Sequence, residues 1–580
     1  MKTRFLCGSI AIVSLAALAA CSRSTTKTTT TAIPHLQRQG TATQLIVDGK
    51  PFLVLSGELR NSNTSTPDSA KSIWPKLAAA HLNTVLSVVT WEQLEPQEGK
   101  FDFTLVDSQI RDAEANKLRL GFLWFGSWKN GVSSYVPAWV KTNEARFPRA
   151  IRKDGSSTEV LSTLSTEGRD ADARAFRALM RHIKEVDTTR RLIMVQVENE
   201  VGFGSDSRDM SEAASKAFEA PVPKQLLDYI SANKDKLHPM LRKAWVTGGS
   251  KMSGTWEQVF GKSVYTDDLF MAWNYASYVG AVAAAGKAEY PLPMFVNDAC
   301  AMPSPERPEP RGGGRPNPEV NNIWALAAPA IEIHSPDLYT PNIPVMAEWY
   351  QESYKGVNPL FIPETDGNTG TYHVFYVVGQ HEGIGFSPFG IDEYCIARPG
   401  AKSLDPAKLP LAESYATLAQ LAPVILANQG KGVMAGVVTG AREAPQKITL
   451  GNYVMEVTYN VGFQGFGAKT EVAAPPPVFA MVSLEAVEMP ERAGALMIAL
   501  GPDEYLIAGS GPLNFKFSAA GPATERVGIL SIEEGTYVNG NWTPGRRLNG
   551  DENGGGTSLQ LGGGESRNGK IQRIKLYRYK

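Results

Sequence analysis

Acidic side chains follow two apolar stretches that have the composition of buried strands. The stretch MVQVENEVG, at 194–202, closes on Glu198, Asn199 and Glu200, and the stretch PLFIPE closes on Glu364. A carboxylate that leaves water costs several kcal/mol unless it is paired or used. We therefore interpret these strand ends as the place where the chemistry of the chain is done.

Two carboxylic acids that converge on one pocket are what glycoside hydrolysis requires. One protonates the leaving oxygen, and the other attacks or stabilises the anomeric carbon. Other chemistries find less support, because no Ser/His/Asp or Cys/His set stands at the strand ends. His334, His373 and His381 are interpreted as packed or surface histidines. No H-E-x-x-H or other metal spacing is present, so neither a metal nor a cofactor is predicted.

The elements that must position these carboxylates repeat along residues 33–430. An apolar strand with a polar or aromatic end, followed by a helical stretch, recurs eight times, with strands in 52–58, 82–96, 118–131, 191–202, 292–299, 331–341, 358–365 and 382–392. Near-continuous apolar strands that alternate with helices indicate a parallel sheet covered on both faces. We predict a (β/α)₈ barrel, whose active site lies at the carboxyl ends of the strands. A doubly wound open sheet is the rival, but no glycine-rich phosphate-binding turn follows any strand.

The chain changes character after the barrel. Residues 431–580 contain short strands separated by glycine, proline and asparagine turns, so they are predicted to form an all-β, sandwich-like accessory domain. A chain of 580 residues is too long for one ordinary core, which fits a large domain followed by a smaller one.

The N-terminus carries a targeting pattern. Lys2 and Arg4 precede an apolar run, so residues 1–20 are predicted to be a secretory signal peptide. The letters LAAC resemble a lipobox and make Cys21 the predicted lipidated residue. An ordinary signal peptide cut nearby is the alternative. Residues 21–32 are a Ser/Thr-rich tether. The expected location is the periplasm or outer membrane, with the membrane touched only through the lipid anchor.

Charge and cysteine content exclude some classes of partner. The net charge is −1 with interspersed signs, which argues against nucleic acid as a partner. Cys300 and Cys395 are too few for a disulfide framework and are read as free or, alternatively, bridged. The sequence leaves the oligomeric state open.

Several motifs together resemble glycoside hydrolase family 35, the β-galactosidases, within the clan A retaining barrel glycosidases. They are SGE…W at 56–74, LNTV at 82–85, W-x-x-x-E-P-x-x-G-x-F-D-F at 91–103, VPAW at 136–139 and VQVENEVG at 195–202. The resemblance covers most of the barrel and is closest to a bacterial branch with a divergent C-terminal β-domain.

The resemblance implies roles for the strand-end residues. Glu200 matches the general acid/base, Asn199 the partner of the sugar 2-hydroxyl, and Glu364 the nucleophile. A retaining enzyme needs its two carboxyls about 5–5.5 Å apart. Glu200 is expected to be protonated at rest, with its pKa raised by Glu364 and by burial. Glu364 is expected to be ionised, and Tyr339 is the candidate donor to it.

The sequence also departs from the family pattern. Leu94-Glu95-Pro96 replaces His-Glu-Pro, as in the related family 42, and Val88 replaces a common tyrosine. The third-strand motif Cys-Ala-Glu-Trp is absent, and its galactose-binding glutamate falls on Asn130. The candidate replacements are Trp128, Lys129 and Asn130, with the tryptophan exposed for stacking on a pyranose.

Two other strand-end side chains have two readings each, and three more have one. Trp91 either lines the pocket or packs the barrel. Glu198 either binds substrate or holds Glu200 or a cation in place, and this supporting role is favoured. Glu95 is read as a carboxylate that orders a loop. Asp337 and Asp366 are read as ion-paired loop residues.

The expected function is that of a retaining glycoside hydrolase that acts on a carbohydrate and removes terminal β-D-galactosyl residues, with plant cell-wall fragments such as galactosylated xyloglucan as candidate substrates. The alternatives are another clan A exo-β-glycosidase, a β-glucosidase or an arabinosidase, and a non-catalytic carbohydrate-binding lipoprotein. One structural condition follows. Strict strand alternation puts residues 198 and 200 on one face and 199 on the other, so Asn199 and Glu200 can serve one sugar only if the strand bulges or breaks there.

Overall fold

The computed structural model describes Met1 and residues 32–204, 206–299, 313–339, 347, 358–392, 410–441, 443–460, 492–521, 525–562 and 570–580. The predicted signal peptide, Cys21, Cys300 and Cys395 lie outside the described residues. Within the described ranges, no helix has the length and apolarity to cross a membrane.

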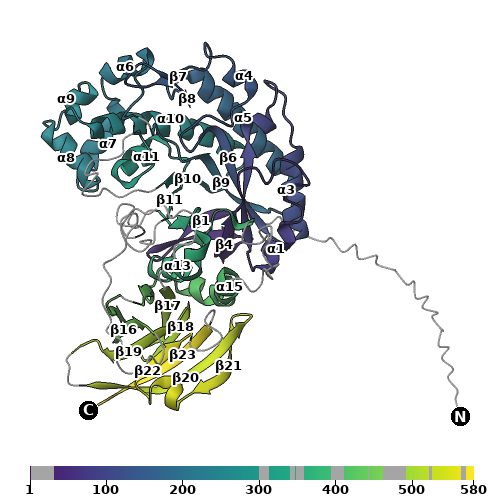
Figure 1. Cartoon of the computed structure of the whole chain (residues 1–580), viewed down its shortest axis with the longest axis vertical. Helices are drawn as coiled ribbons and strands as arrows, with labels where there is room; N and C mark the ends of the chain where they lie inside the picture. The colour runs from purple at the N-terminus through teal and green to yellow at the C-terminus, as the bar shows by residue number, and fades with distance from the viewer. Residues whose placement is uncertain are drawn as a thin grey trace.

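Eight parallel strands close into a barrel (Figure 1), which confirms the predicted fold class. Their order around the ring is β11-β10-β9-β6-β5-β4-β13-β12, and a parallel bridge between Leu338 and Thr365 joins the two ends. The strands are β4 (Val54–Glu58), β5 (Thr84–Thr90), β6 (Arg119–Lys129), β9 (Leu192–Asn199), β10 (Met294–Ala299), β11 (Ile333–Asp337), β12 (Phe361–Ile362) and β13 (Gly385–Phe386).

Helices surround the barrel and extend its loops. The described helices of this part of the chain are α1 (Trp74–Ala79), α2 (Trp91–Leu94), α3 (Thr104–Ala115), α4 (Ala138–Lys141), α5 (Thr166–Val186), α6 (Glu212–Glu219), α7 (Lys224–Ala232), α8 (Pro239–Thr247), α9 (Trp256–Phe260), α10 (Val264–Glu289), η1 (Pro318–Val320), α11 (Asn321–Ala327), α13 (Gly367–Gln380) and α15 (Pro410–Asn428). A two-stranded ribbon, β7 (Arg149–Ile151) and β8 (Ser157–Leu161), follows α4.

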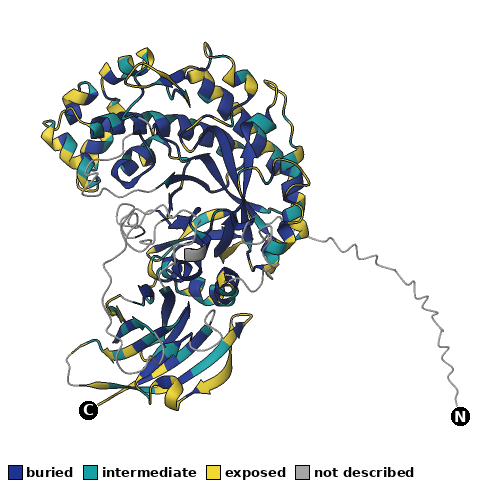
Figure 2. Cartoon of the chain, in the orientation of Figure 1, coloured by how far each residue is buried: buried dark blue, intermediate teal, exposed yellow. Residues whose placement is uncertain are grey.

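Helix α5 shows how sequence sets these elements. The Ser165 hydroxyl accepts the N–H of Gly168 and caps the helix. Apolar residues at helical spacing, from Ala171 through Phe176 to Ile183, are buried. Figure 2 shows the result for the whole domain, with buried strands inside and helices exposed on their outer faces.

The amino end of the barrel is filled by apolar side chains. A small antiparallel sheet of β1 (His35–Gln39), β2 (Ala42–Val47) and β3 (Lys50–Phe52) supplies Leu45 and Val47. These residues join one buried cluster with inward side chains such as Val54, Phe125 and Phe295. Polar groups are therefore gathered at the opposite end, where the strands finish.

The C-terminal region is all-β. A six-stranded antiparallel sheet has the order β14-β17-β18-β23-β20-β21, and a four-stranded sheet has the order β15-β16-β19-β22. The elements are β14 (Met434–Gly440), β15 (Gln446–Leu450), β16 (Tyr453–Tyr459), β17 (Arg492–Gly501), β18 (Glu504–Ser510), β19 (Leu513–Ala519), β20 (Arg526–Val538), β21 (Asn541–Leu548), η3 (Gly550–Asn553), β22 (Ser558–Leu561) and β23 (Lys570–Tyr579).

Strand β17 serves two cores because its side chains alternate. Ala495 and Met497 join the cluster between the two sheets, whereas Leu496 and Ile498 join the core of the barrel. Helix α13 lies directly on this second face. A Cβ built on Gly494 would stand 2.3 Å from the carbonyl oxygen of Tyr372, and one on Gly436 2.7 Å from that of Tyr376.

The first prediction concerns this contact. Gly494→Ala should lower the free energy of unfolding by about 1–3 kcal/mol, because its methyl group meets backbone that cannot move alone. Gly501→Ala, at the end of the same strand, is the matched control, since a Cβ there meets nothing within 4 Å. Urea unfolding compares the two variants with the wild-type chain. Equal midpoints for the two variants would contradict the contact.

Candidate active site

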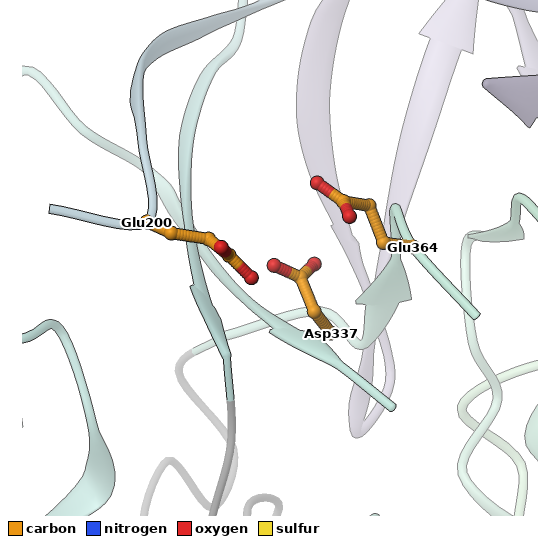
Figure 3. A group of neighbouring side chains, drawn as sticks. All are labelled: Glu200, Asp337 and Glu364. Atoms are coloured by element: carbon orange, nitrogen blue, oxygen red, sulfur yellow. The ribbon is translucent and has the colours of Figure 1, made fainter. Parts of the chain in front are cut away.

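Three carboxyl groups meet at the carboxyl end of the barrel. Glu200 follows β9, Asp337 ends β11 and Glu364 follows β12, and the three side chains project into one space (Figure 3). One oxygen of each lies within 4.8 Å of the others. The two glutamates chosen from the sequence are therefore brought together, although 164 positions separate them in the chain.

The backbone breaks where β9 ends. Glu198 and Glu200 have left-handed φ angles of 63° and 43°. Beside them, β6 gains residues relative to β9, because Trp124 pairs with Val197 but Lys129 pairs with Asn199. The predicted break is thus confirmed. It turns Asn199 toward the carboxyl groups of the barrel mouth, and Glu198 away from them.

Three donors hold Glu364. Asn199 Nδ2 donates to its Oε1 at 3.2 Å, as does Asn297 Nδ2 at 3.2 Å. The Tyr339 hydroxyl donates to its Oε2 at 2.7 Å, as expected from the sequence. Donors on both oxygens stabilise negative charge and fix the direction of the carboxylate.

Asn297 links this carboxylate to the two others. Its Nδ2 also donates to Asp337 Oδ2 at 2.7 Å, and its Oδ1 accepts the backbone N–H of Glu200 at 2.9 Å. A single amide from β10 therefore fixes the spacing of Glu200, Asp337 and Glu364. Sequence reasoning missed this role, although Asn297 stands in the polar end of the predicted strand at 292–299, and that position was the signal that could have nominated it.

A side-chain hydrogen bond joins Glu200 and Asp337, and the pKa of each carboxyl group is raised. Burial and, next to it, the negative charge of Glu364 raise the pKa of Glu200 to about 7. Burial also holds the pKa of Asp337 well above its usual range, with Glu364 and Glu200 adding to the effect. The reading of Asp337 as an ion-paired loop residue is wrong: it ends a strand and is 2% exposed.

Lys129 supplies positive charge to the cluster. Its Nζ donates to Asn199 Oδ1 at 2.9 Å. Burial lowers the pKa of Lys129, but the surrounding carboxylates, led by Glu364 and Glu58, outweigh burial and raise it overall. The ammonium group therefore stays charged beside the acids. Three carboxylates this close could also hold a cation, an arrangement that linear spacing could not reveal because each comes from a different strand.

Glu198 and Trp128 do not face this space. Glu198 Oε2 accepts the N–H of Trp128 at 2.7 Å, and burial together with Asp172 of α5 raises the pKa of Glu198 well above its usual range. The Trp128 ring is 1% exposed and packs edge-on against Tyr275 and Tyr278, at centroid distances of 5.0 and 4.6 Å. The expectation of an exposed stacking tryptophan is wrong, and Glu198 holds the backbone of Trp128 and faces Asp172 rather than the space between Glu200 and Glu364.

Trp91 and Asn130 are also placed elsewhere. Trp91 is fully buried, meets Trp139 edge-on, and donates from Nε1 to Glu95 at 2.8 Å, so it packs the barrel. Glu95 also accepts the N–H of Gly99 and orders that loop, as expected. Asn130 is an exposed turn residue with φ of 54°, outside the buried cluster.

One residue of the mouth was missed. Glu58 ends β4, has no exposed surface, and its carboxyl group interacts electrostatically with Glu364, Lys129 and Glu200. The motif SGE contained it, and its place at the end of the first barrel strand was the signal that could have nominated it.

Comparison with known proteins supports a glycosidase. A family model described as Beta-galactosidase, glycoside hydrolase family 42, matches residues 61–263. A second model, a domain of unknown function (DUF5597), matches residues 411–560. The assignment to family 35 is not supported, since the matching model is that of family 42. The coarser class, β-galactosidases of the same clan, is supported.

Two curated relatives are also described as β-galactosidases. A β-galactosidase of Xanthomonas manihotis is 30% identical over 206 residues, which are 33% of this chain and 31% of that protein. β-Galactosidase 11 of Arabidopsis thaliana is 31% identical over 118 residues, 19% of this chain and 14% of that protein. The chain thus matches about a third or less of the length of these relatives. The crystal structure of a β-galactosidase from Bacillus circulans sp. alkalophilus matches at 14% identity, with 64% of this chain and 57% of that chain covered and a TM-score of 0.44.

The second prediction concerns the titration of Glu200. The group should be protonated below about pH 7 and charged above it. Glu364→Gln removes the neighbouring negative charge, so the pKa of Glu200 should fall. Carbon-13 NMR of labelled glutamate side chains, assigned with Glu200→Gln, measures both values.

Glu319→Gln is the control for this titration. Burial, together with the charges of Asp268 and Asp298, raises the pKa of Glu319 to about 8, and Glu364 is not among the causes. This variant should leave the Glu200 titration unchanged. An unchanged titration in Glu364→Gln would mean that the two catalytic candidates do not interact.

Proposed function

We propose that this protein is a retaining glycoside hydrolase that removes terminal β-D-galactosyl residues from oligo- or polysaccharides. The observation that carries the proposal is the approach of Glu200 and Glu364, with oxygens within 4.8 Å across the barrel mouth. Retaining enzymes hold their two carboxyls about 5–5.5 Å apart, and inverting enzymes about 6.5–9.5 Å apart to admit a water. The short spacing favours direct attack by a carboxylate.

In the first step, Glu364 attacks the anomeric carbon. A bond forms between its oxygen and that carbon as the glycosidic bond breaks, and the proton of Glu200 passes to the leaving oxygen. The hydrogen bonds from Asn199, Asn297 and Tyr339 aim the attacking carboxylate. The raised pKa of Glu200, about 7, keeps a proton available near neutral pH.

In the second step, water replaces the enzyme carboxylate. Glu200 takes a proton from the water, whose oxygen bonds to the anomeric carbon as Glu364 leaves. The covalent intermediate removes the negative charge of Glu364, which is one cause of the raised pKa of Glu200. Glu200 is therefore the stronger acid in the intermediate and is deprotonated when a base is needed.

The remaining groups bind the sugar. Asn199 is proposed to contact the 2-hydroxyl, and Lys129, which bonds to it at 2.9 Å, to hold that amide in place. Asp337 is proposed to hold Glu200 in position through the hydrogen bond between them. The family model and the curated relatives, all described as β-galactosidases, favour galactose over the glucose or arabinose of other clan members.

The third prediction tests the reaction. The protein should hydrolyse 4-nitrophenyl β-D-galactoside, with the β-anomer of galactose as the first product in proton NMR. Glu364→Ala should lower kcat by about 10⁴-fold or more, because the nucleophile is lost. Glu200→Ala should slow substrates with poor leaving groups more than nitrophenyl glycosides, which need little protonation.

The outcomes separate the candidate functions. Hydrolysis of the β-glucoside or an arabinoside, without hydrolysis of the galactoside, would mean that the enzyme prefers glucose or arabinose to galactose. Full activity in Glu364→Ala would show that Glu364 is not the nucleophile. Binding of galactose without hydrolysis of any glycoside would favour a carbohydrate-binding lipoprotein.

We also propose that the chain is exported and tethered by a lipid on Cys21 in the periplasm or outer membrane, where fragments of plant cell-wall polysaccharide would be its substrates. The pattern LAAC supports this location. The fourth prediction is that Cys21→Ala releases the protein from the membrane fraction without changing its activity. Undiminished membrane association would remove the anchor from the proposal.

A further inference from the structure

Glu58 stands in the barrel mouth without a hydrogen-bonding partner. It has no exposed surface, and neither of its carboxyl oxygens has a hydrogen bond in the described structure. A buried carboxyl group left this way costs several kcal/mol. In native proteins such a group calls for a specific explanation, and a role in binding or catalysis is one.

Strand geometry aims Glu58 into the barrel. Val54 and Glu58 share one face of β4, since side chains alternate along a strand. Val54 belongs to the apolar cluster inside the barrel, whereas Leu53 and Leu55 belong to the core outside it. Glu58 therefore points inward at the last position of the strand, above the apolar floor.

The ring order places Glu58 across the barrel from β10, two strands from β12 and three from β9. Glu200 follows β9 and Glu364 follows β12, and β10 and β11 lie between these two strands. Across the ring from that quarter stand β4 and β5, and Glu58 ends β4. Its carboxyl group interacts with Glu364, Lys129 and Glu200, so it borders the same space.

A pyranose bound with its anomeric carbon between Glu200 and Glu364 extends toward this wall. In a pyranose ring, C4 is the carbon directly opposite C1, so its hydroxyl lies at the end of the ring that is remote from the cleaved bond. We propose that Glu58 binds the C4 hydroxyl of the sugar that is cleaved, and that this contact sets the preference for galactose. The proposal rests on the proposed glycosidase function and deepens it.

The electrostatics of the mouth agree with this role. Burial raises the pKa of Glu58 well above its usual range, Glu364 adds to the effect, and Lys129 opposes it. A carboxyl group in this state accepts hydrogen bonds and, when protonated, also donates one. A site built to bond a hydroxyl rejects analogues that lack it or hold it elsewhere, because its own polar group is then left unpaired. Galactose and glucose differ only in the direction of this hydroxyl.

The fifth prediction uses a cycle of enzyme and substrate changes. Glu58→Ala should lower kcat/KM on 4-nitrophenyl β-D-galactoside about 10- to 100-fold, the range for a lost hydrogen bond to a carboxyl group. On the 4-deoxy substrate the same variant should differ from the wild type by no more than about twofold, because the bond is already absent. On the 2-deoxy substrate, Glu58→Ala should again lower kcat/KM by the full factor, because the C4 hydroxyl is present. Glu58→Gln should recover part of the activity on the parent substrate.

Two results would overturn the assignment. Equal losses on all substrates would make Glu58 a structural residue, and a loss that disappears with a 3-deoxy or 6-deoxy substrate would assign it another hydroxyl. Glu319→Gln is the matched control, a buried carboxyl with a raised pKa that interacts with Asp268 and Asp298. It should leave all the ratios unchanged.

A binding measurement separates this proposal from the glycosidase proposal. Calorimetry with galactose and 4-deoxygalactose compares the wild-type chain with Glu58→Ala. If the wild type hydrolyses no glycoside but binds galactose, and only galactose binding weakens in the variant, the Glu58 assignment holds while the glycosidase function fails. If the wild type hydrolyses galactosides and the variant matches it in both assays, only the Glu58 assignment fails. If the wild type neither hydrolyses galactosides nor binds galactose, both fail.

Discussion

Mutual repulsion among carboxyl groups governs the barrel mouth. Two like charges 4.8 Å apart repel by about 3–4 kcal/mol at an effective dielectric constant of 20. Glu58, Glu200, Asp337 and Glu364 could not all be ionised in such a space. Lys129 neutralises part of the charge, and bound protons neutralise more, as the raised pKa values of Glu200 and Asp337 indicate. The same repulsion that opposes folding keeps a proton where an acid catalyst needs it.

The break in β9 keeps a fifth carboxyl group, that of Glu198, out of the barrel mouth. A regular strand would point Glu198 and Glu200 to one side, and Asn199 to the other. The left-handed residues at 198 and 200 reverse this, at a cost of about 1–3 kcal/mol each. Glu198 then meets Asp172 behind β6. Gly126 permits that approach, because a Cβ there would lie 2.6 Å from Glu198 Oε1 and 2.8 Å from Asp172 Oδ1.

The fold and the central pair could be predicted from the sequence because both depend on local patterns. Apolar strands alternating with helices indicate the barrel, and a glutamate at a strand end is placed at the mouth by the barrel itself. The prediction for Trp128 was wrong because the extra residues of β6 turn its ring into the core. The periodicity of the sequence does not indicate such an irregularity. The roles of Asn297 and Asp337 were missed because they depend on side chains that other strands bring beside them, which local sequence patterns do not show. Glu58 was visible as a strand-end residue, but its lack of a partner is a property of the folded structure alone.

The half of the barrel that carries Glu364 depends on the C-terminal domain. The β-galactosidase model matches residues 61–263, which include Asn199 and Glu200 but end before the nucleophile candidate. Helix α13 begins three residues after Glu364 and lies against the backbone of β14 and β17 at Gly436 and Gly494. Such close contact leaves the helix little freedom to shift, and β12 is only two residues long. The β-sandwich therefore braces the helix that follows Glu364, through backbone contacts that lie outside the pocket.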